Sequence, residues 1–334
     1  MPQLNKSLCK MKVVNPVFSI ITPVYNRADC VGRCIESVIR NLSDEIPIEH
    51  IIVDDGSSDD TAEVVSQYTS RYSHIKFLRF EKNKGTNAAR NAAIAIAMGE
   101  WCIILDSDDY FVDDALEYVT ETMHEKKGYR HYMFAPDDMQ CIYEKNQELN
   151  KFQKELSFSD FLSGSVSGDF IHVCCTKILR AHPFDERVRV HEGVFFLMFF
   201  RDAQKMLFTN RVVTIRERNR EDSVTRETIR TNKNIIGRII SADELLVQTF
   251  EGDYLRLGLE KQLHDIQLAL YDNYLLVGRY ADAKRVEKEI GRDRSLKFRV
   301  LNMIRILHAG CLYRIMLQSY LKWKYNVVKT KLRQ

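Results

Sequence analysis

The first hundred residues alternate between short apolar runs and segments with helical spacing. The apolar, β-branched runs, each of which stops abruptly at polar residues, are 17–22, 48–53, 75–80 and 101–105. This is typical of strands that are buried on both faces. The segments with apolar residues at helical spacing are 28–42, 61–72 and 86–97. The alternation of strand and helix predicts an α/β fold with a doubly wound, mostly parallel sheet.

The rest of the chain shows a weaker pattern and then a change of character. Helices are expected at 114–127, 158–162 and 192–200, and strands at 131–135, 139–143, 170–177, 205–209 and 212–216. After about residue 230 the pattern indicates long helices only. We therefore expect one domain at 1–230, with two halves at about 16–110 and about 111–230, followed by a helical C-terminal region at 231–334.

Composition limits the class of protein. With 334 residues, 45% of them hydrophobic, the chain can bury a large core. Its eight cysteines lack the paired spacing of a zinc site and the density of a disulfide framework, which favours a reducing cytosol. The N-terminus has no apolar signal core, and no stretch reaches the ~18 to 20 apolar residues that span a bilayer. We expect a cytoplasmic protein.

Three acids crowd the end of one predicted strand. The run IILDSDD at 103–109 places Asp106, Asp108 and Asp109 within four residues. Such acids repel one another unless a cation lies between them, and Mg²⁺ or Mn²⁺ prefers carboxylate oxygens and shares its shell with nucleotide phosphates. For an isolated acidic turn, capping of the following helix would be the better explanation. The neighbouring strand ends favour the metal.

Two other strand ends carry polar groups suited to a nucleotide. The first ends in TPVYNR, where Pro23 fixes a turn and Tyr25 offers a flat ring to a base, although ordinary packing explains most such tyrosines. The second ends in DDGSSDDT, where Ser58 or Asp59 can cap the next helix. That leaves Asp54 and Asp55 without a local role. An acid at this place commonly binds ribose hydroxyls or a base edge.

A polar turn then opens the third helix of this half. In NKGTNAARN, at 83–91, Arg90 and Lys84 can neutralise a diphosphate, and a solvated helix face explains the segment equally well. The segments TPVYN, VDDGSSDDT, NKGTNAARNAA and GEWCIILDSDD follow in this order within 16–110. Together they resemble glycosyltransferase family 2.

The resemblance implies both a fold and an activity. The fold is the GT-A nucleotide-diphospho-sugar transferase fold, here with a helical C-terminal extension. The activity is inverting hexosyl or N-acetylhexosaminyl transfer from a nucleotide-diphosphate sugar, UDP-linked in our reading, to a hydroxyl of a glycan or lipid-linked glycan. The residues expected to bind the nucleotide sugar are Pro23, Tyr25, Asp54, Asp55, Arg90, Asp106, Asp108, Arg216 and Arg218. Asp108 and Asp109 are expected to hold Mg²⁺ or Mn²⁺, and which of the three acids ligates directly stays open.

Two further segments carry expected site residues. RERNREDSVT, at 216–225, resembles the closing segment of the family, in which Arg216 and Arg218 cover the donor diphosphate; a salt-bridged surface loop explains it nearly as well. Inversion also needs a base opposite the leaving group. The family usually offers Glu-Asp downstream of the metal motif, and this chain reads Glu192-Gly193. We expect Glu192 to be the base, with Asp185 as runner-up and His191 as its neighbour; a helix-start acid favoured by the helix dipole is the alternative.

The C-terminal tail differs from the rest of the chain in its charge. Residues 295–334 hold nine Lys or Arg and no Asp or Glu, which leaves −6 for residues 1–294. Apolar residues recur among these cations at helical spacing. Such a helix can lie in a membrane interface, or it can pack on the catalytic domain with a basic outer face. The basic residues do not belong to a recognisable nucleic-acid-binding fold, so no nucleic-acid partner is expected.

The resemblance implies a glycosyltransferase of bacterial surface polysaccharide synthesis, with about 16–110 as its nucleotide-binding half and about 111–230 as its acceptor half. With the basic tail, it predicts an enzyme that is peripheral on the inner face of the cell membrane. Two alternatives remain open. A nucleotidyltransferase also uses a doubly wound sheet and an acidic metal site, but it often carries a Gly-rich basic loop near its first strand, which 22–27 is not. A catalytically inactive sugar-nucleotide-binding scaffold gains weight from Gly193, which replaces the second acid of the family pair.

Overall fold

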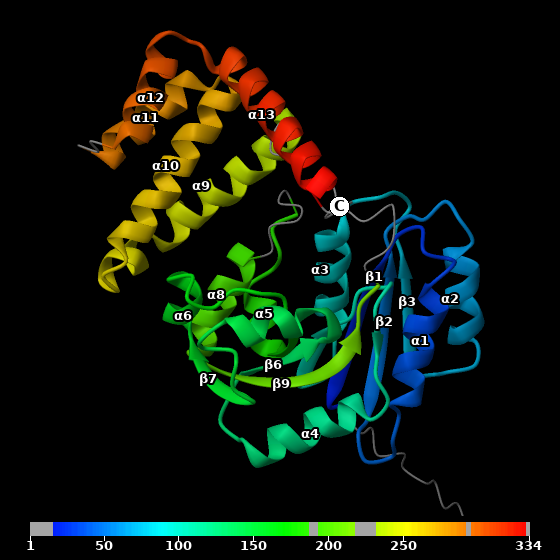
Figure 1. Cartoon of the computed structure of the whole chain (residues 1–334). Coiled ribbons are helices and arrows are strands. Elements are labelled where there is room, and N and C mark those ends of the chain that lie inside the picture. The colour runs from blue at the N-terminus through cyan, green and yellow to red at the C-terminus, as the bar shows by residue number, and fades with distance from the viewer. Residues whose placement is uncertain (1–15, 187–192, 218–231, 292–294, 332–334) are drawn as a thin grey trace, which may run out of the picture. The chain divides into compact units, whose positions relative to one another are not determined.

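The computed structural model describes residues 16–186, 193–217, 232–291 and 295–331 (Figure 1). Expected site residues Glu192 and Arg218 lie outside these ranges, as does His191. The chain forms two compact units, which are described separately. The sheet unit comprises Met1–Leu156, Gly168–Phe184 and Asp202–Glu217. The helical unit comprises Ser157–Ser167, Asp185–Arg201 and Arg218–Gln334.

The first half of the sheet unit is a parallel sheet. Its strands are β1 (Phe18–Val24), β2 (Ile48–Asp54), β3 (Ile75–Arg79) and β4 (Trp101–Ile104), which pair in the order β3-β2-β1-β4. The connecting helices are α1 (Val31–Arg40), α2 (Thr61–Thr69) and α3 (Thr86–Ile96). Helices α1 and α2 lie on one face of these strands and α3 on the other (Figure 1). The predicted alternation is confirmed, and the carboxyl ends of the strands meet at one edge.

The remaining strands extend the sheet in mixed directions. They and their helices are β5 (Tyr110–Phe111), α4 (Ala115–Glu125), β6 (His131–Pro136), η1 (Asp137–Met139), α5 (Gln140–Lys145), β7 (Gln153–Ser157), β8 (Ile171–Cys175), α7 (Thr176–Ala181) and β9 (Lys205–Ile215). The order continues β4-β8-β6-β9-β5, and β7 pairs with β9. Strand β8 runs antiparallel to β4 and β6, β5 runs antiparallel to β9, and β6 and β9 are parallel.

Two strand predictions in this half are wrong. Residues 139–143 end η1 and enter α5 rather than forming a strand. Their two buried side chains, Met139 and Tyr143, are four residues apart, which is the spacing of one helix face and not of a strand. The expected strands at 205–209 and 212–216 are one continuous strand, β9. The polar pair Asn210-Arg211, which separates the two expected strands, coincides with a shift of the register of β9 against β6.

The sheet is locked at the amino ends of its strands by a buried carboxylate, Glu49 on β2. It accepts hydrogen bonds from the Ser19 hydroxyl at 2.5 Å and from the Gly99 backbone N–H at 3.2 Å, and it pairs with Lys76 at 2.5 Å. Burial opposes ionisation of Glu49, but these partners outweigh it and its pKa is lowered. A Cβ on Gly99 would lie 2.6 Å from the Ser19 nitrogen, so only glycine fits this approach.

The described elements after residue 231 are all helices, as the pattern indicates. The helical unit also includes Ser157–Ser167 and Asp185–Arg201, which belong to the expected domain at 1–230. Its helices are α6 (Phe158–Leu162), the largest part of α8 (Gly193–Ala203), α9 (Lys233–Arg256), α10 (Glu260–Val277), α11 (Tyr280–Ile290), α12 (Leu296–Ile306) and α13 (Gly310–Lys331). Its core includes Ile240 of α9, Tyr271 and Leu275 of α10, Val286 of α11 and Leu301 of α12. Among the described helices, none combines the length and apolar character needed to cross a bilayer.

Candidate active site

The three acids lie on a tight turn between β4 and β5. The Asp109 backbone N–H donates to the Asp106 carbonyl at 2.9 Å, which closes the turn. The turn begins beside β1, because the Leu105 N–H donates to the Ile21 carbonyl at 2.9 Å. The Asp106 side chain is 49% exposed, whereas Asp108 and Asp109 are half-buried. The acids therefore stand at the carboxyl edge of the parallel strands.

Helix α1 holds the backbone of this turn. Three successive carbonyl oxygens accept side-chain hydrogen bonds from the start of the helix: Asp106 from Cys34 Sγ at 3.7 Å, Ser107 from Cys30 Sγ at 3.7 Å, and Asp108 from Arg33 Nη2 at 3.4 Å. Burial raises the pKa of the Cys34 thiol well above its ordinary value, so the thiol keeps its proton and can donate. These contacts fix the backbone of the turn to α1, whose Cys34 side chain is buried.

Crowding changes the ionisation of Asp109. Burial and the negative charges of Asp106 and Asp108 raise the pKa of Asp109 to about 8. The positive charge of Arg216 and a hydrogen bond from the Glu217 backbone N–H oppose this shift without cancelling it. A carboxyl that keeps its proton near neutrality for this reason marks a place where a cation would be favourable.

Helix α3 supplies a cation on one side of the turn. Arg90 Nη2 pairs with the Asp106 carboxylate at 3.1 Å, and the Arg90 guanidinium lies 5.4 Å from the ring centre of Phe184. The next residue, Asn91, exchanges two hydrogen bonds of 2.9 Å with the Phe184 backbone. Asp185 follows Phe184 directly in the chain. Asn91 therefore fixes Phe184, the residue before the alternative base Asp185, to helix α3.

The two acids at the end of β2, Asp54 and Asp55, have hydrogen-bond and ion-pair partners that the sequence did not reveal. Asp54 accepts from the Ser57 N–H at 2.9 Å and pairs with Arg79 at 3.1 Å. Asp55 accepts from the N–H groups of Lys84 and Gly85 at 2.6 and 2.8 Å. The interpretation that Asp54 lacks a local role is wrong, because Ser57 is its neighbour in the chain. The other partners lie far along the chain, so the sequence could not show them. Asp55 positions the turn that opens α3, and nucleotide contact by either acid stays a prediction.

The loop after β1 presents an aromatic ring at the same edge. Pro23 is buried within β1, whereas Tyr25 is 43% exposed. Asn26, at a φ of 50°, ties this loop to the one after β2: its N–H donates to the Ser57 hydroxyl and its side-chain oxygen accepts from the Ser58 N–H, both at 2.9 Å. The ring of Tyr25 is thus exposed on a loop whose next residue is fixed, and stacking of a base on it stays a prediction.

The remaining expected residues have different positions. Arg216 lies at the end of β9, where it pairs with Asp138 at 2.6 Å and Asp169 at 3.2 Å. Its ion pairs within the sheet unit give it a structural role beside any contact with a diphosphate. Asp185 is half-buried and belongs to the helical unit. Contact of Arg216 with the donor diphosphate and the role of Asp185 as a base stay predictions.

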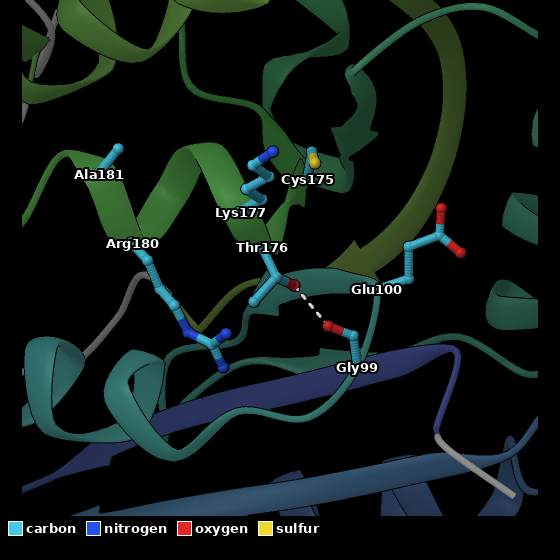
Figure 2. A pocket seen from close by; sticks show the side chains of 7 residues that line it. All are labelled: Gly99, Glu100, Cys175, Thr176, Lys177, Arg180 and Ala181. Atoms are coloured by element: carbon cyan, nitrogen blue, oxygen red, sulfur yellow. Dashed lines mark hydrogen bonds between the residues drawn. The ribbon is translucent and has the colours of Figure 1, made fainter.

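A cavity of about 710 Å³ lies elsewhere, at the opposite end of β4 (Figure 2). Its lining includes Gly99, Thr176, Lys177 and Arg180. The Thr176 hydroxyl donates to the Gly99 carbonyl at 2.7 Å, and Arg180 donates to the Ile94 carbonyl at 3.2 Å at the end of α3. Two of these polar groups thus support the fold, and the three acids do not line the cavity.

The three acids by themselves do not complete a metal site. Within the described ranges, no group of three or more His, Cys, Asp or Glu side chains could hold a metal ion. Mg²⁺ and Mn²⁺ at phosphate-binding sites take one or two carboxylates and complete their shell with phosphate oxygens and water. Asp108 and Asp109 can supply such a partial set, and a bound diphosphate would supply the rest.

Comparison with known structures supports the fold. S. aureus TarS 1-349 in complex with UDP-GlcNAc matches with a TM-score of 0.57 at 18% identity, covering 86% of this chain and 90% of that one. The mannosyltransferase PcManGT from Pyrobaculum calidifontis in complex with GDP-Man and Mn2+ matches with a TM-score of 0.50 at 16% identity, covering 92% and 86%. The mixed, mostly parallel sheet is thus of the GT-A type.

Comparison of sequences gives the family. Residues 19–179 match the profile of Glycosyl transferase family 2. The chain is 30% identical to a Campylobacter jejuni GalNAc(5)-diNAcBac-PP-undecaprenol beta-1,3-glucosyltransferase over 219 residues, 63% of this chain and 67% of that relative. It is 37% identical to the poly(ribitol-phosphate) beta-glucosyltransferase of Bacillus spizizenii over 99 residues, which cover 29% of this chain but only 16% of that one. The chain belongs to glycosyl transferase family 2 and is a glycosyltransferase.

Sequence reasoning missed Arg33, which joins three segments at the site. Besides its bond to the turn, Arg33 pairs with Glu217 at the end of β9, and its guanidinium lies 4.6 Å from the ring centre of Tyr110 on β5. The only signal in the sequence is its spacing: Cys30, Arg33 and Cys34 share one face of α1. Because Glu217 in turn donates its backbone N–H to Asp109, Arg33 positions two of the three acids.

We predict that Arg33→Ala weakens Mn²⁺-dependent binding of a nucleotide sugar about 10-fold, because the turn loses a donor to its Asp108 carbonyl and its link to Glu217. Its melting temperature should change little, since exposed ion pairs contribute about 0 to 1 kcal/mol. Titration calorimetry gives the affinity. Arg40→Ala, on the same helix and paired with Asp113, is the control. Equal affinities of both variants would contradict the positioning role.

Proposed function

We propose that this glycosyltransferase moves a hexose or N-acetylhexosamine from a UDP-linked donor to a hydroxyl of a glycan or lipid-linked glycan in bacterial surface polysaccharide synthesis. The observation that carries the proposal is the crowded acid turn, fixed at the same sheet edge as the exposed ring of Tyr25. The relatives support the substrate class. Their names specify undecaprenol-linked and poly(ribitol-phosphate) glucosyl transfer, and the TarS structure contains UDP-GlcNAc.

Charge decides how the donor binds. A diphosphate would be repelled by Asp106, Asp108 and Asp109 unless a divalent cation lies between them. We propose that Asp108 and Asp109 hold Mg²⁺ or Mn²⁺ together with the donor diphosphate. When bound, the metal supplies Lewis-acid stabilisation of the departing nucleotide. Arg90 already neutralises the Asp106 carboxylate. Asp106 is therefore better suited to bind ribose or sugar hydroxyls than to bind a metal.

Inversion places a base on the face of the sugar opposite the leaving group. We propose Glu192 for this base, with Asp185 as the alternative. The base takes the proton from the acceptor hydroxyl as its oxygen attacks the anomeric carbon, while the bond to the donor diphosphate breaks. The support for Asp185 is its place in the chain after Phe184, which Asn91 fixes to α3. The support for Glu192 is the family pattern at the start of α8.

A lipid-linked acceptor would bring the enzyme to a membrane surface, and we propose that residues 295–334 bind that surface.

Membership of a glycosyltransferase family removes the nucleotidyltransferase alternative. The inactive scaffold differs from the enzyme in one measurable respect, because it would bind a UDP-sugar without turning it over. Slow hydrolysis or transfer by the wild type therefore separates the two.

For the metal site, we predict that Asp108→Ala lowers the rate of donor turnover at least about 100-fold at saturating Mn²⁺, a loss of roughly 2.7 kcal/mol of transition-state stabilisation. Release of UDP from a screened set of UDP-sugars measures it. Asp113→Ala is the control, since that acid is exposed and pairs with Arg40 outside the turn. Equal turnover by the two variants would contradict metal binding by the turn.

For the base, we expect Glu192→Gln to reduce kcat by about 10² to 10⁴, the usual contribution of a general base, with donor affinity unchanged. Rapid-quench transfer assays and donor titration separate the two effects. Asp185→Asn tests the runner-up, and the exposed Glu186→Gln is the matched control. A loss only in Asp185→Asn would transfer the role to Asp185. Full activity of both variants would eliminate both carboxylates.

A further inference from the structure

Helix α12 has two apolar faces, and only one of them is covered. Its inner face places Phe298 and Leu301 in the core of the helical unit. The outer face carries four large apolar side chains that are exposed at 78%, 48%, 61% and 70%: Leu296, Val300, Met303 and the following cap residue Leu307. Their spacing of four, three and four residues places them on one stripe of the helix. The core does not account for this stripe.

Helix α13 repeats the arrangement. On its inner face, Tyr313 and Leu317 pack against the same core and Arg314 donates to the Leu276 carbonyl at 3.1 Å. Its outer face carries exposed side chains at the same spacing or beside that stripe: Leu312, Ile315, Met316, Tyr320 and Trp323. The sequence left open whether the tail packs on the protein or faces a membrane. The described part of the tail packs with one face and exposes another.

The exposed apolar side chains are concentrated in these two helices. Ten of the seventeen large hydrophobic side chains that are exposed in the described residues lie between Leu296 and Trp323. Such a concentration marks an interaction surface rather than ordinary scatter. Every charged side chain within 295–334 is a cation, and one of them, Arg305, pairs inward with Glu287 of α11 at 3.2 Å. Lys297 and Arg299 are exposed beside the α12 stripe.

The charge selects the occupant. A second copy paired symmetrically through this face would bring cations against cations, which is unfavourable. An anionic lipid surface attracts them and accepts the apolar side chains into its interface. Tyr320 and Trp323, whose ring centres are 6.2 Å apart, are the aromatic types that lie at the headgroup level of a bilayer. Lipid is therefore the occupant that fits both features.

We infer that the outer stripes of α12 and α13 form a docking surface for an anionic lipid bilayer, with both helices lying along the membrane surface. The inference deepens the proposed function and rests on it for the lipid-linked acceptor. Lipid binding can be measured without a sugar donor. The docking surface and the transferase activity can therefore fail separately.

The first experiment measures sedimentation of the full chain with vesicles of phosphatidylcholine alone or with phosphatidylglycerol. The wild type should bind the anionic vesicles at least 10-fold more tightly. The variant Leu296→Gln, Val300→Gln, Met303→Gln and Leu307→Gln should lose at least 10-fold of that binding. The matched control changes four exposed apolar residues of the sheet unit: Ile96→Gln, Met98→Gln, Ile142→Gln and Phe152→Gln. Equal binding by both variants would overturn the inference.

The second experiment locates the surface. The chain has two tryptophans, so Trp101→Phe leaves Trp323 as the fluorescent reporter. Its emission should shift to the blue with anionic vesicles and stay unchanged with phosphatidylcholine. If the four-glutamine variant loses helical circular dichroism, Lys297→Glu with Arg299→Glu replaces it and should weaken anionic binding. No shift in Trp323, or self-association by light scattering in place of vesicle binding, would overturn the inference.

Discussion

The structure of the site depends on holding three carboxylates close together at the edge of the sheet. Left to themselves, Asp106, Asp108 and Asp109 would separate, because their charges repel at short range. Helix α1 prevents this by binding three successive carbonyl oxygens of the turn. The repulsion then appears as the raised pKa of Asp109. The proposed cation would relieve this repulsion and would be shared with the phosphates of a nucleotide donor.

The rest of the edge is built by cross-links between loops that are distant in sequence. Asn26 joins the loops after β1 and β2, and Asp55 joins the loop after β2 to the start of α3. Arg90 then connects α3 to the acid turn. Each loop is therefore held by another loop or by a helix. Such fixed positions keep the ordering cost of donor binding small.

The sequence predicted the parallel half well because strands buried on both faces give continuous apolar runs, and the intervening helices have clear periodicity. It failed at 139–143, where a short buried segment is compatible with both structures and only the four-residue spacing of Met139 and Tyr143 distinguishes them. The acid turn was visible because its residues are consecutive. Arg33 was not, because its importance comes from three contacts made after folding. The partners of Asp55 were hidden for the same reason.

The most direct test of the central claim is a titration of the protein with Mn²⁺ and a UDP-sugar by calorimetry at pH 7 in buffers of different ionisation enthalpy. Because the pKa of Asp109 is raised to about 8, metal and donor binding should release up to about one proton. Chelation of the metal should weaken donor binding at least about 10-fold, or 1.4 kcal/mol. The account would be contradicted if a UDP-sugar bound equally well without metal and no proton were released.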